Sequence, residues 1–363
     1  MSTIQLTTGI TITEMVVPRS LDAADAADFH AAVALNNAVC LAETGLDDLS
    51  RTAEEMLPQW QQTEDAVHRT LLAREGDQIV GAVVIIHAMA EPTSAEIDLM
   101  VLPENWGRGI ETALLAAAEA EVRALGRQVI QTWTLHQADH GESPLQPKTG
   151  WGLVSRSPLA QLLLDDGFTL EQSERNSALH LRTDLSSIEQ MLSAAIDAAG
   201  PDYRLVEWTV PTPRQWQDGY AWALSRMSTD APSGDLDVDE EIWDAARIKR
   251  RDARFVEGGQ TVSVTAVEHI PSGTLAAFNE LVIGSDLSCV THQYCTLVLK
   301  EHRGHRLGQL VKCANILRMR DIAPLSPKIS TFNAEENRPM LDINEAIGFV
   351  PASYAGAWQK RLV

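Results

Sequence analysis

The sequence is poor in cysteine, in long apolar runs and in positive charge, and each shortage excludes a class of protein. Its four cysteines, Cys40, Cys289, Cys295 and Cys313, show no CxxC spacing, so neither a disulfide framework nor a zinc site is predicted. No uninterrupted apolar run reaches the roughly 18 residues of a transmembrane helix. The N-terminal segment lacks the regions of a secretion signal. A cytoplasmic protein without a membrane partner is expected.

Positive residues are outnumbered, with 29 Lys and Arg against 50 Asp and Glu and a net charge of −21. Such a chain would repel a phosphate backbone, because non-specific nucleic-acid affinity comes mainly from Lys and Arg. Nucleic acid is therefore not an expected partner. The same charge favours cationic substrates such as amines, although an acidic surface also serves solubility alone.

The length of 363 residues exceeds one ordinary core and suits two domains of about 180 residues each. A composition of 45% hydrophobic and 22% charged residues is typical of soluble globular proteins. An amphipathic stretch at 186–199 is stopped by Gly200-Pro201, where glycine caps a helix and proline cannot continue it. The predicted organisation is a domain at 1–185, a linker helix at 186–201 and a domain at 202–363.

Apolar periodicity predicts the same order of elements in both halves. The first half reads as strand 10–17, helices 23–42 and 52–61, strands 68–73, 78–88 and 95–102, helix 110–125, strand 128–135, helix 158–166 and strand 177–181. The second reads as strand 203–210, helices 213–227 and 240–255, strands 261–269, 274–283 and 291–299, a helix to Arg320, strand 328–332 and helix 338–347. The repeated order indicates duplication of one fold.

In each half a glycine-containing turn stands between the last strand of a meander and the next helix. The turns are 103–109 and 301–308. Such a turn presents free backbone N–H groups and the positive end of the helix dipole, which together bind phosphate. An ordinary strand-to-helix turn explains either segment equally well. A dinucleotide fold is not favoured, because neither turn supplies Gly-x-Gly-x-x-Gly after a first strand.

The turns resemble the Arg/Gln-x-x-Gly-x-Gly/Ala signature of the GCN5-related N-acetyltransferase (GNAT) family. Arg303-Gly304-His305-Arg306-Leu307-Gly308 matches its outer positions, with Arg306 at the middle glycine. Trp106-Gly107-Arg108-Gly109-Ile110-Glu111 keeps only the middle glycine. Asn333, Asn337 and the segment 344–349 resemble the family's Asn-x-x-Ala and Tyr-Glu-x-x-Gly-Phe segment. The tandem layout is similar to that of the mycothiol synthases.

This resemblance implies an α/β (α+β) fold of two tandem GNAT-type domains. Each would hold a splayed, mixed, mostly antiparallel sheet flanked by helices, whose fourth and fifth strands part to admit the pantetheine arm of acetyl-CoA. The implied cofactor-binding residues are Leu297, Val298, Leu299, Arg303, Gly304, His305, Arg306, Leu307, Gly308, Asn333 and Asn337, with Met100, Val101, Leu102, Gly107, Arg108, Gly109, Ile110, Glu111 and Thr112 as the corresponding set in the first half.

Acetyl transfer to an amine needs a base for the amine, a donor to the oxyanion and an acid for the thiolate. In the family a fourth-strand carboxylate commonly serves as the base. Glu96 takes that position in the first half and Gln293 in the second. The family's tyrosine acid is replaced by Leu163 and Asn344. Each half therefore departs from the pattern.

The C-terminal domain is nevertheless favoured as catalytic, because it keeps more of the loop. Its candidate groups are Glu280, His292, Glu301, Tyr294 and Tyr354, while Glu96 is the candidate if the N-terminal domain is active. Several predicted site residues also have a plain structural interpretation: an exposed strand or loop position for the glutamates, core packing for Tyr294 and a helix cap for the predicted cofactor contact Asn337.

The sequence thus predicts an acetyl-CoA-dependent N-acetyltransferase that acts on the primary amine of a small molecule, as a monomer or homodimer and without a metal. A non-catalytic acyl-CoA-binding module is the alternative. The Trp-rich segment 207–222 suits helix packing, and alternatively an aromatic wall for an amine's cation.

Overall fold

The computed structural model describes residues 4–5, 9–89, 93–230 and 232–362. The chain forms two compact units. The first unit comprises 1–174, 234–239 and 353–363, and the second unit comprises 175–233 and 240–352. Across the described ranges, no helix combines the length and apolar character needed to cross a bilayer.

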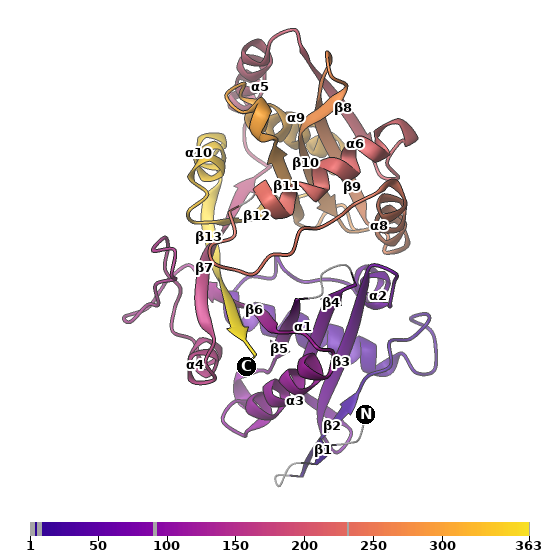
Figure 1. Cartoon of the computed structure of the whole chain (residues 1–363), viewed down its shortest axis with the longest axis vertical. Helices are drawn as coiled ribbons and strands as arrows, with labels where there is room; N and C mark the ends of the chain where they lie inside the picture. Colours follow the sequence, from indigo (N-terminus) through magenta and orange to yellow (C-terminus); the bar gives the residue numbers. More distant parts are fainter. Residues whose placement is uncertain (1–3, 6–8, 90–92, 231, 363) are drawn as a thin grey trace. The chain divides into compact units, whose positions relative to one another are not determined.

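Both halves contain the predicted order of strands and helices (Figure 1). The elements are β1 (Ile4–Gln5), β2 (Ile10–Glu14), α1 (Ala27–Thr44), α2 (Ala53–Trp60), β3 (Ala66–Glu75), β4 (Gln78–Ala88), β5 (Ser94–Met100), η1 (Pro103–Asn105), α3 (Ile110–Ala124), β6 (Val129–Gln137), α4 (Pro158–Asp165), β7 (Thr169–His180), α5 (Ser186–Ala199), β8 (Tyr203–Thr209), α6 (Arg214–Ser225), α7 (Met227–Asp230), α8 (Ala245–Glu257), β9 (Thr261–His269), β10 (Thr274–Ile283), β11 (Thr291–Val298), η2 (Lys300–His302), α9 (Leu307–Ile322), β12 (Lys328–Ala334), α10 (Arg338–Ile347) and β13 (Val350–Arg361).

The first unit is a mixed sheet in the order β1-β2-β3-β4-β5-β6-β13-β7. Strands β2 to β5 form an antiparallel meander, while β5 and β6 run parallel. Along β4, Val83 and Ile85 join the core beneath α3 and α4, while Ala82 and Val84 join the core beneath α1 and α2. Because helices cover both faces, this strand is buried on both sides and reads as a continuous apolar run.

The second unit repeats the plan with strand order β7-β12-β11-β10-β9-β8. Phe278 and Val282 of β10 pack with residues of α6 and α8. Leu281 and Ile283 of the same strand pack with residues of α5 and α9 on the other face. The expected fold class, two mixed and mostly antiparallel sheets flanked by helices, is confirmed.

The end of the chain completes the first unit. Residues Ser353–Arg361 of β13 pair antiparallel with β6, from Ser353 opposite Gln137 to Arg361 opposite Val129. Trp358 on this segment is fully buried in the core of the first unit, and its indole N–H donates to Thr134 Oγ1 at 2.9 Å. The last strand therefore provides both sheet pairing and core volume.

We expect Trp358→Ala to destabilise the first unit by about 3–5 kcal/mol, because it leaves a large cavity in the core and removes the hydrogen bond to Thr134. Trp151→Ala is the matched control, since Trp151 is 50% exposed. Denaturant unfolding monitored by circular dichroism measures both. Equal, small losses in the two variants would contradict this role of Trp358.

Candidate active site

In the first unit the two parallel strands separate before they end. Strands β5 and β6 pair from Ser94 opposite Val129 to Ile97 opposite Thr132, yet β5 continues to Met100 and β6 to Gln137. Beyond the last pair, the facing edges of the two strands no longer hydrogen-bond to each other. The parting of the fourth and fifth strands that the sequence resemblance implies is therefore present.

A cavity of about 420 Å³ lies beyond the point of separation. It is lined by the ends of β5 and β6, the start of α4 and the side of α1. The lining residues are Val39, Ala42, Glu43, Val101, Pro103, Trp106, Leu135, His136, Gln137, Asp139, Gly141, Ser155, Ser157, Pro158 and Leu159. We call it the large chamber.

A second cavity of about 160 Å³, the small chamber, lies beside it. Its walls are Asn36, Val39, Cys40, Glu43, Glu96, Ile97, Asp98, Leu99, Met100, Trp133, Leu135 and Leu159. Val39, Glu43, Leu135 and Leu159 line both chambers. The two cavities therefore meet at these four side chains, of which Glu43 alone is ionisable.

Glu43 is held at this junction by α1, and its carboxyl accepts a hydrogen bond from the backbone N–H of Leu135. Burial, followed by the charge of Asp98, raises the pKa of Glu43 to about 8. Burial raises the pKa of Asp98 on β5 to about 6. Near neutral pH Asp98 is therefore mostly ionised, while Glu43 is poised to exchange a proton.

Cys40 lies one helical turn before Glu43 in the wall of the small chamber. Burial and then the charges of Asp98 and Glu43 raise the pKa of its thiol to about 12. The thiolate is the nucleophilic form of cysteine. Cys40 is thus kept as a thiol and is not suited to carry an acyl group.

His136 stands in the wall of the large chamber with a hydrogen-bond partner on each ring nitrogen. Its Nδ1 lies 2.8 Å from Ser155 Oγ and its Nε2 lies 2.6 Å from Thr134 Oγ1. Burial, followed by the charge of His140, lowers the pKa of His136 to about 4. The imidazole is therefore neutral, and it fixes the hydroxyl of Ser155, which also lines the chamber.

The glycine turn of the first unit leads into α3. Gly107 and Gly109 adopt φ of 76° and 81°, a conformation that favours glycine. Glu111, the second residue of α3, folds back so that its Oε1 accepts the Gly107 N–H at 3.1 Å. Its other oxygen, Oε2, is buried without a hydrogen-bond partner. A carboxylate therefore occupies the inside of this turn.

The glycine turn of the second unit leads into α9 in the same way. Gly304 has φ of 91°, and Arg306 takes the left-handed conformation with φ of 54°. The second helical residue is Gly308, where an added Cβ would lie 3.2 Å from Ile343 Cδ1 and 3.4 Å from Val298 Cγ2. This position therefore has no space for a side chain, in contrast to Glu111.

Near this turn, the aromatic rings of Tyr203, His269, His302 and His305 lie close together. The centroid of the Tyr203 ring lies 5.1 Å from those of His269 and His305, and its hydroxyl lies 2.9 Å from His302 Nδ1. Burial, followed by the charge of His269, lowers the pKa of His302.

In the second unit, Glu280 and Gln293 stand at positions considered for catalysis, and both make structural contacts instead. Glu280 is fully buried, lies 2.7 Å from Arg251 in an ion pair and accepts a short hydrogen bond from the hydroxyl of Tyr220. It is therefore a core ion pair rather than an exposed strand residue. Gln293, at the family's base position, accepts from Lys312 Nζ at 2.6 Å and donates to Thr331 at 2.8 Å.

The other candidates belong to different elements. Tyr294 is 40% exposed, with its ring centroid 6.0 Å from that of Phe255, and Glu301 is exposed on η2. Tyr354, suggested by the sequence as a proton donor of the C-terminal domain, belongs instead to the first unit. There it pairs with His136 across β13 and β6, because the last strand completes the first sheet. Glu96 does join Glu43 and Asp98 in the small chamber.

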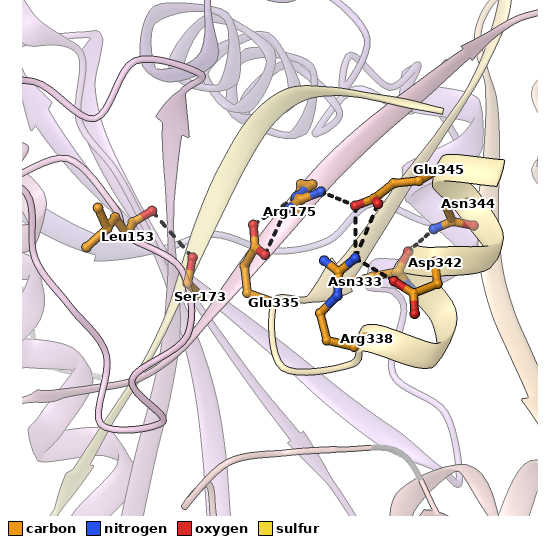
Figure 2. A network of polar contacts seen from close by, with 9 residues as sticks. All are labelled: Leu153, Ser173, Arg175, Asn333, Glu335, Arg338, Asp342, Asn344 and Glu345. Atoms are coloured by element: carbon orange, nitrogen blue, oxygen red, sulfur yellow. Dashed lines mark hydrogen bonds and ion pairs between the residues drawn. The ribbon is translucent and has the colours of Figure 1, made fainter. Parts of the chain in front are cut away.

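Asn333 of β12, a predicted cofactor contact, belongs to a polar cluster with α10 that is shown in Figure 2. Asn333 accepts a hydrogen bond from Asn344 Nδ2 at 2.7 Å. Arg175 of β7 holds Glu335 and Glu345 through contacts of 2.8 and 2.9 Å. Asn337 stands at the N-cap of α10 without a capping hydrogen bond from its side chain. This cluster ties α10 to the sheet of the second unit.

Four residues of the first-unit site were not identified from the sequence: Glu43, Asp98, His136 and Ser155. A signal for Glu43 exists, since Asn36, Val39, Cys40 and Glu43 recur at the spacing of one helix face. Asp98 alternates with Glu96 along β5, which places both on one side of the strand. No comparable pattern marks His136 or Ser155.

Comparisons with known proteins agree with this architecture. Residues 40–142 match the model of the acetyltransferase (GNAT) family. The chain is similar to a tandem GNAT protein from the clavulanic acid biosynthesis pathway, at 23% identity and a TM-score of 0.71, over 96% of this chain and 98% of the other. A GCN5-related N-acetyltransferase from Sphaerobacter thermophilus aligns at 12% identity and a TM-score of 0.57, over 99% and 97%.

A third similar structure is a GCN5-related glucosamine N-acetyltransferase region of a fungal multi-domain β-N-acetylglucosaminidase, at 13% identity and a TM-score of 0.59. It covers 97% of this chain and 38% of the other. No curated protein matches the chain by sequence. The resemblance to the GNAT family is confirmed, as a family match over part of the first unit and as a shared tandem fold over nearly the whole chain.

We expect Glu43→Gln to stabilise the chain at alkaline pH. The carboxyl has a pKa of about 8 when folded against 4.5 as its ordinary value, so the folded state keeps a proton that the unfolded state releases between these pH values. Stability therefore falls as pH rises through this window. Calorimetric Tm values near pH 5 and pH 9 should show similar melting at the lower pH and a variant several degrees more stable at the higher.

Glu142→Gln is the control for that measurement, because Glu142 is exposed. It should melt in parallel with the unmodified chain at both pH values. If Glu43→Gln also melts in parallel, the carboxyl of Glu43 is not held in its protonated form by the fold.

Proposed function

We propose that this chain, a tandem GNAT-fold protein with a GNAT-family match at residues 40–142, is an acetyl-CoA-dependent N-acetyltransferase whose chemistry takes place in the first unit. The observation that carries the proposal is the meeting of two cavities at a carboxyl with a pKa of about 8. One cavity suits the thioester arm and the other a small amine. The first unit is chosen over the second because these chambers lie within it.

The residues of the large chamber fit the thioester arm of acetyl-CoA. The facing edges of β5 and β6 offer backbone groups beyond Ile97 and Thr132, and an extended amide-containing chain hydrogen-bonds to such edges. Acetyl-CoA supplies an activated acyl group. Val39, Leu135 and Leu159 exclude water where the chambers meet.

Glu43 is the general base of this proposal. A primary amine is mostly protonated at neutral pH and attacks a carbonyl only after losing a proton. The ionised carboxylate of Glu43 accepts that proton, and its raised pKa makes it a stronger base than an ordinary glutamate. Asp98, ionised at lower pH, attracts the ammonium form of the amine into the small chamber.

Ser155 is the proton donor of this proposal. Its hydroxyl lines the large chamber and is positioned by the neutral ring of His136 at 2.8 Å. A proton reaches the departing thiolate through this hydroxyl, which takes a proton from solvent in the same step because serine alone is a weaker acid than a thiol. Since Cys40 stays a thiol, the amine attacks the thioester directly and no acyl-cysteine forms.

The second unit supports a second candidate function, the binding of an acyl-CoA without turnover. The segment Lys300–Arg306 carries Lys300, His302, Arg303, His305 and Arg306 beside a helix N-terminus, which favours a phosphate. Glu280, by contrast, forms a buried ion pair with Arg251 and does not serve as a base in this proposal. The predicted contacts of Arg303, Gly304 and Gly308 with coenzyme A belong to this proposal.

We expect thiol release from acetyl-CoA, assayed with a panel of small primary amines, to rise with pH up to about 8. Glu43→Gln should lower kcat on the order of 100-fold and remove this dependence, because glutamine cannot accept a proton. Glu54→Gln, an exposed position on α2, should retain the original rate and profile. An unchanged rate and profile in Glu43→Gln would exclude Glu43 as the base.

Ser155→Ala should lower kcat about tenfold or more with little change in the KM for the amine, because only the leaving thiolate loses its donor. A thioester of a more acidic thiol, which leaves without help, should be cleaved at nearly the same rate by both proteins. Equal losses with both thioesters would argue against the role of Ser155. Binding of acetyl-CoA without turnover of any amine would favour the non-catalytic function for the whole chain.

A further inference from the structure

The phosphate-binding end of α3 already holds a negative charge from the protein itself. Helix α3 is 15 residues long and begins at Ile110, and the free N–H groups and dipole of such an end attract anions. Glu111 directs its carboxyl into this end, where Oε1 accepts the Gly107 N–H at 3.1 Å. One amide of the turn is therefore engaged by a carboxylate.

The second oxygen of Glu111 makes this arrangement costly. Glu111 is 7% exposed, and Oε2 is buried without a hydrogen-bond partner. An unpaired buried polar atom costs free energy, and this one belongs to a side chain whose other oxygen is bound inside the turn. An unsatisfied acceptor beside a helix N-terminus indicates a site shaped for an anion and filled by an imperfect one.

The second unit provides the comparison within the same chain. Gly308 has the place of Glu111, as the second residue of the helix that follows the turn. Gly308 has no side chain to direct into that turn, and an added Cβ there would crowd Ile343 and Val298. Only the first unit carries a charge at this position.

We propose that the Glu111 carboxylate competes with the diphosphate of the acyl donor for the turn, and that it thereby lowers the affinity of the first unit for this diphosphate. The inference rests on the proposed function. Donor diphosphate and the Glu111 carboxylate compete for the Gly107 N–H and repel one another at short range. The first unit therefore holds its donor chiefly through the thioester arm in the large chamber, and releases the spent carrier readily.

Competition by the Glu111 charge and structural support of the turn by its hydrogen bond predict different effects of substitutions at Glu111. Glu111→Gln keeps an oxygen for the Gly107 N–H and removes the charge, while Glu111→Ala removes both. The dissociation constant of coenzyme A at the first-unit site should fall about tenfold in Glu111→Gln. Isothermal calorimetry fitted to two classes of site measures this change directly. Glu104→Gln, an exposed charge on the same turn, is the matched control and should leave the constant within twofold.

A short thioester without a diphosphate distinguishes the effect of the Glu111 charge from an effect of Glu111 on the geometry of the turn. S-acetyl-N-acetylcysteamine presents the acetyl thioester without a diphosphate, so its KM should be unchanged in Glu111→Gln while the KM for acetyl-CoA falls. Equal changes for both thioesters would show that Glu111 acts through the shape of the turn and would overturn the proposal. Unchanged or weaker coenzyme A binding in both folded Glu111 variants would also overturn it.

Calorimetry measures coenzyme A binding without turnover, so its result does not depend on whether the chain transfers an acetyl group. If the unmodified chain releases no thiol with any amine, acetyl transfer fails as the function. The effect of Glu111 on coenzyme A binding is still decided by the dissociation constants. Circular dichroism at the assay temperature confirms that each variant is folded.

Discussion

The structure of the first unit depends on two parallel strands that stop pairing before they end. Hydrogen bonds join β5 and β6 only as far as Ile97 and Thr132. A sheet that paired to its end would have no unsatisfied inner edges and no room for a cavity between them. Both chambers, the placement of Glu43 opposite Leu135, and the exposure of Ser155 to the large chamber follow from this separation.

The strands of the second unit separate likewise, after His292 and Ser330, but with different polar chemistry nearby. Lys312 of α9 reaches Gln293 of β11, and burial lowers the pKa of this lysine to about 7. Glu280 is held by Arg251 in the core. One fold thus appears twice, with Glu43 and Asp98 lining a cavity in one copy, while Glu280 and Lys312 make internal contacts in the other. The glycine turns also differ, because the second unit has Gly308 at the position where the first unit has Glu111.

Much of the fold could be predicted from the sequence, because local patterns determine it. Periodicity and the position of each glycine turn were sufficient to place the meanders, the helices α3 and α9 and the duplication. The pairing of Ser353–Arg361 with β6 could not be predicted, since the alternation of apolar residues in a strand shows which side chains share a face but not which strand it pairs with. For the same reason Tyr354 could not be assigned to the first unit from its position in the chain.

The site was predicted less completely than the fold. Motif positions led to Glu96 and the two turns, and Glu96 does lie in the small chamber. The proton-exchange properties of Glu43 arise from burial and from Asp98 on another element, so they exist only in three dimensions. Glu280 illustrates the converse, because its partner Arg251 lies 29 residues earlier. The sequence alone does not show whether a glutamate on a strand faces a cavity or pairs with an arginine.

The assignment of Ser353–Arg361 to the first unit has a consequence for biosynthesis. A ribosome makes the strands β2 to β6 long before it makes the strand that lies against β6. Until residues 353–361 emerge, the edge of β6 and the core space later filled by Trp358 are exposed, and exposed edges of this kind recruit other chains. The sheet of the first unit therefore stays incomplete while the second unit is translated, and only a polypeptide that includes 353–361 can complete it.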